Sequence, residues 1–253
     1  MILLKNYSGG QVVTFQDIIT AIVAFLAGVI KSAFGIGAGI FLTPVLALVI
    51  NPKEAVVLVA PMMLFTDITA IFQYWRRWSV KDVLLLTPAC LIGAVAGALL
   101  LNWFTPQMAQ RSIGAIGLLY VGTEFLRKFV FPSSGTSGIS KSTFIGIVGG
   151  VTSALANSGG VFISTYLTGR LSKQYFVGTL IAVFLSLNIT KVSMFTGLGM
   201  LNKELWLTVL YLLPLMFIGG LAGKWINTRI HETQFVRLVF ILIVGACIKL
   251  IFF

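Results

Sequence analysis

The sequence predicts an all-α polytopic membrane protein made of two inverted repeats of about five helical segments each, with broken half-helices meeting near the midplane. Of the 253 residues, 58% are hydrophobic and only 10% are charged, and the mean hydropathy is +1.01. Soluble proteins contain about 25% charged residues. Several apolar runs reach the ~20 residues that span a bilayer, and transmembrane β-strands would instead alternate over ~10 residues. These observations favour a helical bundle in a membrane.

The apolar runs divide into two groups of five. The second run of each group is too short to cross a ~30 Å hydrocarbon core at 1.5 Å per residue. We therefore expect it and the run before it to form two half-helices or a tilted, broken pair. The predicted segments are 16–34, 38–50, 54–75, 82–103 and 109–126, followed by 142–156, 160–169, 174–196, 204–226 and 234–252.

The first break falls within residues 27–48, AGVIKSAFGIGAGIFLTPVLAL. An ordinary spanning helix disfavours glycine, proline and charged side chains. Unwound backbone at membrane depth is tolerated only where it is buried in protein or lines a cavity, so the break predicts a binding site. The residues that interrupt the helix are Lys31, Ser32, Gly35, Gly37, Gly39 and Pro44.

A second copy of this stretch lies at residues 149–167, GGVTSALANSGGVFISTYL. Gly28 aligns with Gly150, and Gly39-Ile40-Phe41 aligns with Gly160-Val161-Phe162. The likeness continues with Asp67 against Asn188, and with Pro88, Gly93 and Gly97 against Pro214, Gly219 and Gly223. We therefore expect a first transmembrane repeat at 1–127, a linker rich in Ser, Gly and Pro at 128–140, and a second repeat at 141–253.

Lysine and arginine predict the topology. If the first two segments of each half make a hairpin or two crossings, eleven basic residues fall on one side and five on the other. The positive-inside rule then places the links 76–81, 127–141, 170–173 and 224–237 in the cytoplasm and both termini outside it, across the inner membrane of the cell. Each half crosses an odd number of times, which makes the halves inverted. The N-terminal residues lack signal-peptide order, so no cleavage is expected.

Two lysines inside apolar runs indicate an anion site. Lys31 precedes the glycine turn, and Lys191 lies in the middle of LSLNITKVSMF. We expect Lys31 to be the main ligand that compensates the anion's charge, with Lys191 as a second candidate. A buried lysine is costly unless it faces a polar cavity, although snorkelling is the alternative. Half-helices that start after each turn would add unpaired backbone N–H groups and the positive dipole end. The candidate substrate-binding residues are Lys31, Ser32, Gly35, Gly37, Ala38, Gly39, Ile40, Ser153, Asn157, Ser158, Gly159, Gly160, Val161 and Lys191.

Asp67 is the carboxylate that lies well inside an apolar segment, MMLFTDITAIF. It should be protonated, paired with Lys31 or Lys191, or hydrogen-bonded to the broken-helix backbone. Proton coupling through Asp67 is one hypothesis. A structural cap is the other, because Asn188 occupies the matching position in the second half.

Signals for catalysis, metal and cofactors are missing from the sequence. Cys90 and Cys247 are far apart in apolar runs, and His231 lies in a polar link, so we expect no catalytic residue, no metal site and no cofactor. The net charge of +11 comes from links between apolar segments, where it serves topology better than nucleic-acid binding.

The pattern Gly28…Phe34-Gly35-Ile36-Gly37-Ala38-Gly39-Ile40…Pro44-Val45-Leu46, with its weaker copy at 149–167, resembles the TauE/SafE sulfite exporter family, also called the TSUP transporters. The resemblance covers essentially the whole chain. Ala38 replaces one of the usual glycines, and the second copy has Asn157 and Ser158 where the first has Gly35 and Ile36. The resemblance implies movement of small sulfur-containing anions, such as sulfite, sulfoacetate-like organosulfonates or thiosulfate, often outward.

We therefore predict a secondary transporter, and not an enzyme, that exports a sulfur oxyanion or organosulfonate by alternating access. The alternatives are an uncoupled anion or thiosulfate channel and a membrane sulfur-relay protein, which would need a reactive thiol at Cys90 or Cys247. The expected partners are the small anion and the lipid bilayer. The sequence leaves the oligomeric state open, with a homodimer as one option.

Overall fold

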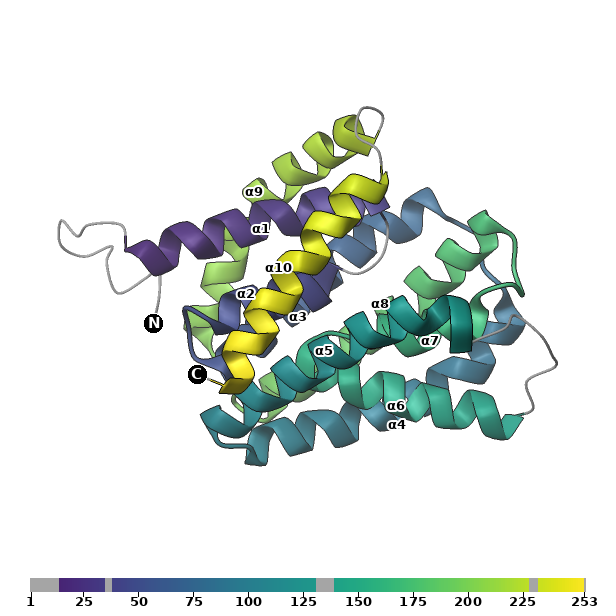
Figure 1. Ribbon diagram of the computed structural model, residues 1–253, viewed down its shortest axis with the longest axis horizontal. Coiled ribbons are helices and arrows are strands. Elements are labelled where there is room, and N and C mark those ends of the chain that lie inside the picture. Colours follow the sequence, from purple (N-terminus) through teal and green to yellow (C-terminus); the bar gives the residue numbers. More distant parts are fainter. Residues whose placement is uncertain (1–13, 35–37, 131–138, 228–231, 253) are drawn as a thin grey trace.

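A computed structural model describes residues 14–34, 38–130, 139–227 and 232–252, and every regular element in these ranges is a helix (Figure 1). Each predicted segment is present, with ends that differ from the prediction by four residues or fewer. The helices are α1 (Phe15–Phe34), α2 (Ala38–Ala47), α3 (Pro52–Gln73), α4 (Val80–Trp103), α5 (Pro106–Val130), α6 (Ile139–Ala156), α7 (Gly160–Leu167), α8 (Lys173–Gly197), α9 (Lys203–Asn227) and α10 (Glu232–Phe252).

Local capping explains why two helices begin earlier than hydropathy predicts. The Asn51 side chain accepts a 3.0 Å hydrogen bond from the Lys53 amide, and Pro52 occupies the first turn of α3. At the start of α4, the Ser79 hydroxyl accepts from the Asp82 amide at 3.3 Å. The polar residues before each apolar run therefore belong to the helix. A prediction from hydropathy leaves them out because they are not apolar.

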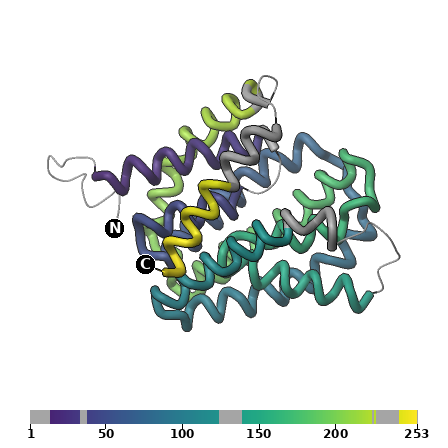
Figure 2. The backbone as a smooth tube through the Cα atoms, viewed as in Figure 1, coloured from purple at the N-terminus to yellow at the C-terminus, as the bar shows by residue number. Residues whose placement is uncertain are grey.

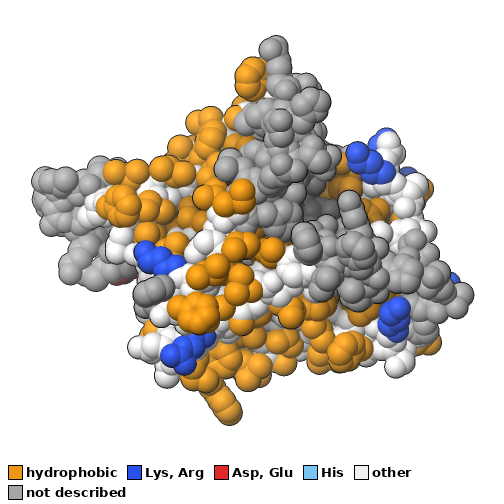
Figure 3. Space-filling view, in the orientation of Figure 1, with side chains coloured by type: hydrophobic (Ala, Val, Ile, Leu, Met, Phe, Trp, Pro, Cys, Tyr) orange, Lys and Arg blue, Asp and Glu red, His pale blue; other side chains and the backbone are white. Residues whose placement is uncertain are grey.

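Six helices of the described chain, α1, α3, α4, α6, α8 and α9, are long and apolar enough to cross a membrane. By contrast, α2 has 10 residues and α7 has 8, which correspond to about 15 and 12 Å. Figure 3 shows hydrophobic side chains over most of the described part of the visible face, with lysine and arginine toward its two ends. The chain is thus a multi-pass membrane protein in which α2 and α7 do not span.

The helix pair α1 and α2 forms a hairpin. The Gln16 side chain at the start of α1 donates a 2.8 Å hydrogen bond to the Val49 carbonyl, just after α2. The chain therefore returns to the end from which α1 began, and α3 starts there. The prediction of a broken pair is confirmed, and of the two geometries left open by the sequence the hairpin is the observed one.

The other end of α3 lies beside the start of α8. Arg77 Nη1 donates to Gln174 Oε1 at 3.1 Å, and Arg170 Nη2 lies 3.7 Å from Asp82 Oδ1. The links 76–81 and 170–173, which the positive-inside rule placed on one side, therefore meet. Since α3 has 22 residues, the open end of the α1/α2 hairpin and the α7/α8 link lie at ends about 33 Å apart.

The first helix of each half of the chain packs against a helix of the other half. α1 packs along α9, and α6 packs along α4, as Figure 2 also shows. A Cβ on Gly28 would lie 2.0 Å from the Met216 carbonyl oxygen, and one on Gly150 would lie 2.1 Å from that of Cys90. Small residues therefore let these helices pack closely, and the two interfaces use aligned positions.

The centre of the bundle is formed by α3 packed on α8. The middle of α3, from Val56 to Met62, is almost completely buried. Other helices, and not lipid, surround this part of α3. Their packing fixes the position of a polar side chain on the helix. Asp67 is that side chain, one and a half turns further along the helix.

Candidate functional site

Lys31 lies in the last turn of α1, and its amine reaches the centre of the bundle. It forms an ion pair with Asp67 Oδ1, and the amine also lies 5.8 Å from the centroid of the Phe184 ring. The side chain of Lys31 is 9% exposed and that of Asp67 is completely buried. The structure therefore agrees with one of the arrangements predicted for Asp67, the ion pair with Lys31.

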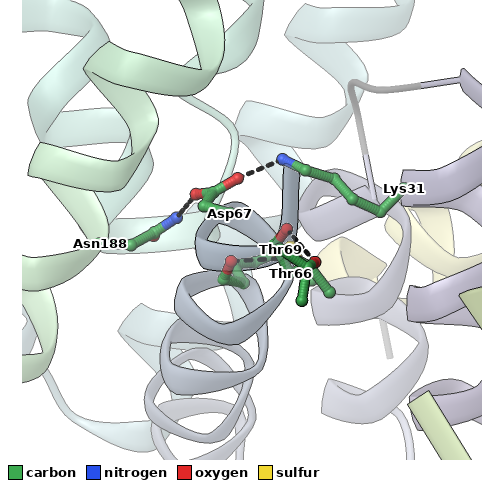
Figure 4. A network of polar contacts seen from close by, with 6 residues as sticks. Lys31, Thr66, Asp67, Thr69 and Asn188 are labelled. Carbon is green, nitrogen blue, oxygen red and sulfur yellow. Dashed lines mark hydrogen bonds and ion pairs between the residues drawn. The ribbon is translucent and has the colours of Figure 1, made fainter. Parts of the chain in front are cut away.

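The second oxygen of Asp67 is also occupied. Asn188 Nδ2 on α8 donates a 2.6 Å hydrogen bond to Asp67 Oδ2 (Figure 4). The hydroxyls of Thr66 and Thr69, drawn in the same view, bond to carbonyls of their own helix and not to the carboxylate. Asp67 thus holds α1 and α8 against α3 with its two oxygens.

The second break is built around Asn157. α6 ends at Ala156 and α7 begins at Gly160, and Asn157 between them has a φ of +53°. Asparagine is among the few residues other than glycine that adopt this left-handed conformation readily. The backbone amide of Asn157 donates to the Ser153 carbonyl at 2.9 Å and so completes the last turn of α6. Asn157 therefore allows the chain to turn between α6 and α7.

The Asn157 side chain connects three further helices. Its Oδ1 accepts a 2.6 Å hydrogen bond from Lys191 Nζ on α8. Its Nδ2 donates at 3.1 Å both to Thr43 Oγ1 on α2 and to the Val56 carbonyl on α3. The role of the Val56 carbonyl could not be predicted from the sequence, because nothing distinguishes one backbone oxygen of an apolar helix from another.

The start of α2 contacts the break between α6 and α7. A Cβ on Gly39 would lie 2.7 Å from the Asn157 carbonyl oxygen and 2.9 Å from its Cβ, so only glycine allows this approach. Gly39 and its neighbours Ala38 and Ile40 are buried. Two interrupted helices from different halves of the chain therefore meet inside the protein, beside Lys191.

Lys191 is the most deeply placed cation of the described chain, with 1% exposure. Besides Asn157, its amine donates to the Ser153 carbonyl at 3.3 Å. Both acceptors are neutral, and within the described ranges no carboxylate oxygen lies within 4.0 Å of this amine. An ammonium group has three donors, so one remains for a further acceptor. We call Lys31, Asp67, Asn157, Asn188 and Lys191 the polar centre.

The remaining predicted residues divide into three groups. Ser158 and Val161 are buried near the tip of α7. The backbone amide of Val161 donates to the Ser158 carbonyl at 3.4 Å, so it is not the unpaired donor that the sequence predicts. Gly159 packs on α6, and Gly160 starts α7. Ser32 is exposed. Gly35 and Gly37 lie outside the described residues.

The described residues contain no group of three or more His, Cys, Asp or Glu side chains that could hold a metal ion. Cys90 on α4 and Cys247 on α10 are buried free thiols. They lie at helix contacts, since a Cβ on Gly117 would meet the sulfur of Cys247 at 2.3 Å. The thiols are therefore positioned for packing.

Comparison with known families supplies the function class. The family model described as sulfite exporter TauE/SafE matches residues 20–250, nearly the whole chain. Searches of curated proteins and of solved structures gave no match. The family consists of membrane transporters for sulfite and related sulfur-containing anions, and both helix breaks and the polar centre lie inside the matched range. The chain therefore belongs to the TauE/SafE sulfite exporter family, as a multi-pass membrane transporter of a small sulfur-containing anion.

Proposed function

We propose that the chain is a secondary transporter that exports a sulfur oxyanion or an organosulfonate by alternating access around the polar centre. The observation that carries this proposal is the contact of Gly39, at the start of α2, with Asn157 in the second helix break. Asn157 also binds Lys191, which has no carboxylate partner among the described side chains. Broken helices that meet at the interface of two repeats form the substrate sites of many transporters. A buried cation with a spare donor selects an anion.

The packing of the two halves supports an inverted arrangement. The α1/α2 hairpin opens at the end of the molecule where α3 begins, and α7 leads to the opposite end, where Arg170 approaches Asp82. Opposite openings are what inverted repeats require, and the paired glycine contacts of α1 with α9 and of α6 with α4 are what a pseudo-two-fold axis would produce. We propose that this axis passes between Asp67 and Asn188, which occupy aligned positions and bond to each other.

The polar contacts at the two ends of the bundle differ in a way that supports alternating access. At the end rich in basic links, Arg77, Ser79 and Asp82 of the first half contact Gln174, Thr179 and Arg170 of the second. At the other end, the described contacts of Gln16 and Lys53 stay within the first half. These polar contacts join the two halves at the proposed cytoplasmic end and would have to break if the protein opened on that side.

Within the polar centre we propose separate roles for the two lysines. Lys191 contacts only neutral acceptors, so its charge is available to the substrate, and Asn157 presents it at the tip of α7. Lys31 is already compensated by Asp67. This reverses the order expected from the sequence, in which Lys31 was the main anion ligand. Asp67 remains the candidate for proton coupling, because protonation would release Lys31 for a second negative charge.

Reconstituted protein tests the transport proposal. Proteoliposomes should exchange internal sulfite or 2-hydroxyethanesulfonate for the external labelled anion, and Lys191→Gln should abolish exchange. Lys203→Gln, at an exposed position at the start of α9, is the matched control and should exchange normally. Accumulation of the anion against its gradient when a proton gradient is imposed would separate coupled transport from a channel. Normal exchange by Lys191→Gln would refute the assignment of the site.

A further inference from the structure

The polar centre contains an odd number of charges. Three ionisable side chains from α1, α3 and α8 meet in the interior of the described chain: Lys31, Asp67 and Lys191. Lys31 and Asp67 cancel as an ion pair, and Lys191 is left with neutral partners. With all three groups ionised, the buried site has a net charge of +1.

Asp67 forms no ion pair or hydrogen bond with Lys191. Its Oδ1 is bound by Lys31 and its Oδ2 by Asn188 at 2.6 Å. Asn188 and Lys191 lie one turn apart on α8, so they face the same region, yet the amide and not the ammonium takes the second carboxylate oxygen. Asn188 is in this sense a positioning residue that keeps Asp67 paired with α1.

No carboxylate of a described side chain contacts Lys191, so an anion bound from outside can compensate its charge. A net charge in a medium of low dielectric is strongly unfavourable, and an opposite charge in contact offsets it. One negative charge brings the site to zero. A neutral or zwitterionic ligand leaves the site at +1, and a ligand with two negative charges changes it to −1.

We propose that the transported species is a monovalent anion, selected by the single uncompensated charge of Lys191. This inference rests on the proposed function and narrows its substrate class. Hydrogensulfite and sulfonates with one negative charge, such as 2-hydroxyethanesulfonate, fit the site. Sulfate, thiosulfate and sulfoacetate have two negative charges near neutral pH and do not fit while Asp67 is ionised.

A series of two-carbon sulfonates isolates charge from size. 2-Hydroxyethanesulfonate, taurine and sulfoacetate share the CH₂–sulfonate group, and at pH 7 their net charges are −1, zero and −2. We expect the purified wild-type protein to bind 2-hydroxyethanesulfonate about tenfold or more tightly than either of the others, measured by displacement of labelled 2-hydroxyethanesulfonate. Equal or tighter binding of sulfoacetate would overturn the proposal with no variant needed.

Variants then change the charge of the site in steps. Asp67→Asn raises it to +2 and should move the preference toward sulfoacetate by about tenfold or more. Lys191→Gln lowers it to zero and should remove binding of both anions. The double variant Asp67→Asn/Lys191→Gln returns it to +1 through Lys31 and should recover preference for the monovalent anion. Lys203→Gln is the control and should match the wild type.

The outcomes separate this inference from the function on which it rests. An unchanged preference in folded Asp67→Asn, or no recovery in the folded double variant, would overturn the monovalent assignment, while loss of binding in Lys191→Gln would still support the site. If no sulfonate and no sulfite binds the wild-type protein, the proposed function fails together with it. If Asp67→Asn does not fold, the wild-type preference decides alone.

Discussion

Asn188 donates a 2.6 Å hydrogen bond to Asp67 although 121 positions of sequence separate them. The two residues occupy aligned positions in the two halves of the chain, one on α3 and the other on α8 (Figure 4). A contact between equivalent positions is expected where a pseudo-two-fold axis passes. The proposed symmetry would not be exact at this point, because Asp67 is charged and Asn188 is neutral.

The Asn188 bond should contribute measurably to stability. Asn188→Ala leaves Asp67 Oδ2 buried without its donor, and we expect a loss of about 1–3 kcal/mol in the free energy of unfolding. Unfolding in mixed detergent micelles, followed by helicity, would measure it. Thr190→Val, which removes a hydroxyl that bonds within its own helix, should cost clearly less. Equal losses from both variants would contradict the role of Asn188.

Breaking the ion pair of Lys31 and Asp67 from one side should be costly. Lys31→Met leaves a buried carboxylate with only Asn188 as partner, and we expect a loss of about 3–5 kcal/mol. The double variant Lys31→Met/Asp67→Leu removes both charges and should recover much of this. A double-mutant cycle on the same unfolding assay gives the coupling energy. Additive losses would show that the two side chains do not interact.

The close helix contacts should respond alike in both halves. Gly28→Ala and Gly150→Ala each place a Cβ about 2 Å from a carbonyl oxygen of the facing helix, so we expect each to lower stability by about 1–3 kcal/mol. Gly245→Ala on α10 meets nothing within 4 Å and should be neutral or stabilising, since alanine favours helix over glycine. Thermal unfolding of the three variants in one detergent would compare them. A large effect of one glycine and none of its counterpart would argue against paired interfaces.

The contact between Arg77 and Gln174 should control transport. Cysteines at these positions, in a Cys90→Ser/Cys247→Ser background, should be joined by a short cleavable thiol cross-linker and should stop exchange in proteoliposomes until the linker is reduced. Lys53 and Asn102, which contact each other within the first half, provide the control pair, and linking them should leave exchange intact. Exchange that continues after complete linkage of positions 77 and 174 would rule out movement at this end.

The variant without cysteines tests whether transport needs a thiol. Cys90 and Cys247 are buried at helix contacts on different helices, so we expect Cys90→Ser/Cys247→Ser to retain anion exchange, with only a modest loss of stability from two buried hydroxyls. Exchange assays with the two single variants would locate any loss. Loss of exchange by a folded double variant would favour the sulfur-relay alternative, in which a thiol carries the chemistry.

The membrane helices and their breaks could be predicted because their causes are local. Apolar length decides which segments can span, and the short runs at α2 and α7 could not, so the interrupted pairs were evident from hydropathy alone. Lys31, Asn157 and Lys191 were likewise found from their position inside apolar runs. The hairpin geometry of α1 and α2 was not decided by length, since two short crossings would have the same hydropathy.

Which side chains pair with each other within the polar centre could not be predicted from the local sequence. The sequence left Asp67 with Lys31 and Lys191 as equal candidates, and it ranked Lys31 first as the anion ligand. The hydrogen bond from Asn157 to the Val56 carbonyl and the position of the Phe184 ring near Lys31 were not predicted. These contacts depend on how helices from different halves are rotated and how closely they approach.

By itself the sequence determined that this chain lies in a membrane and contains two interrupted helix pairs, because a backbone without water must be helical and ten or fewer residues cannot cross the bilayer. Only the tertiary structure decided that Asp67 binds Lys31 and Asn188, which leaves Lys191 with neutral partners. The physical reason is that charge pairing is set by distances between side chains on packed helices. Hydropathy and spacing along one chain do not contain those distances.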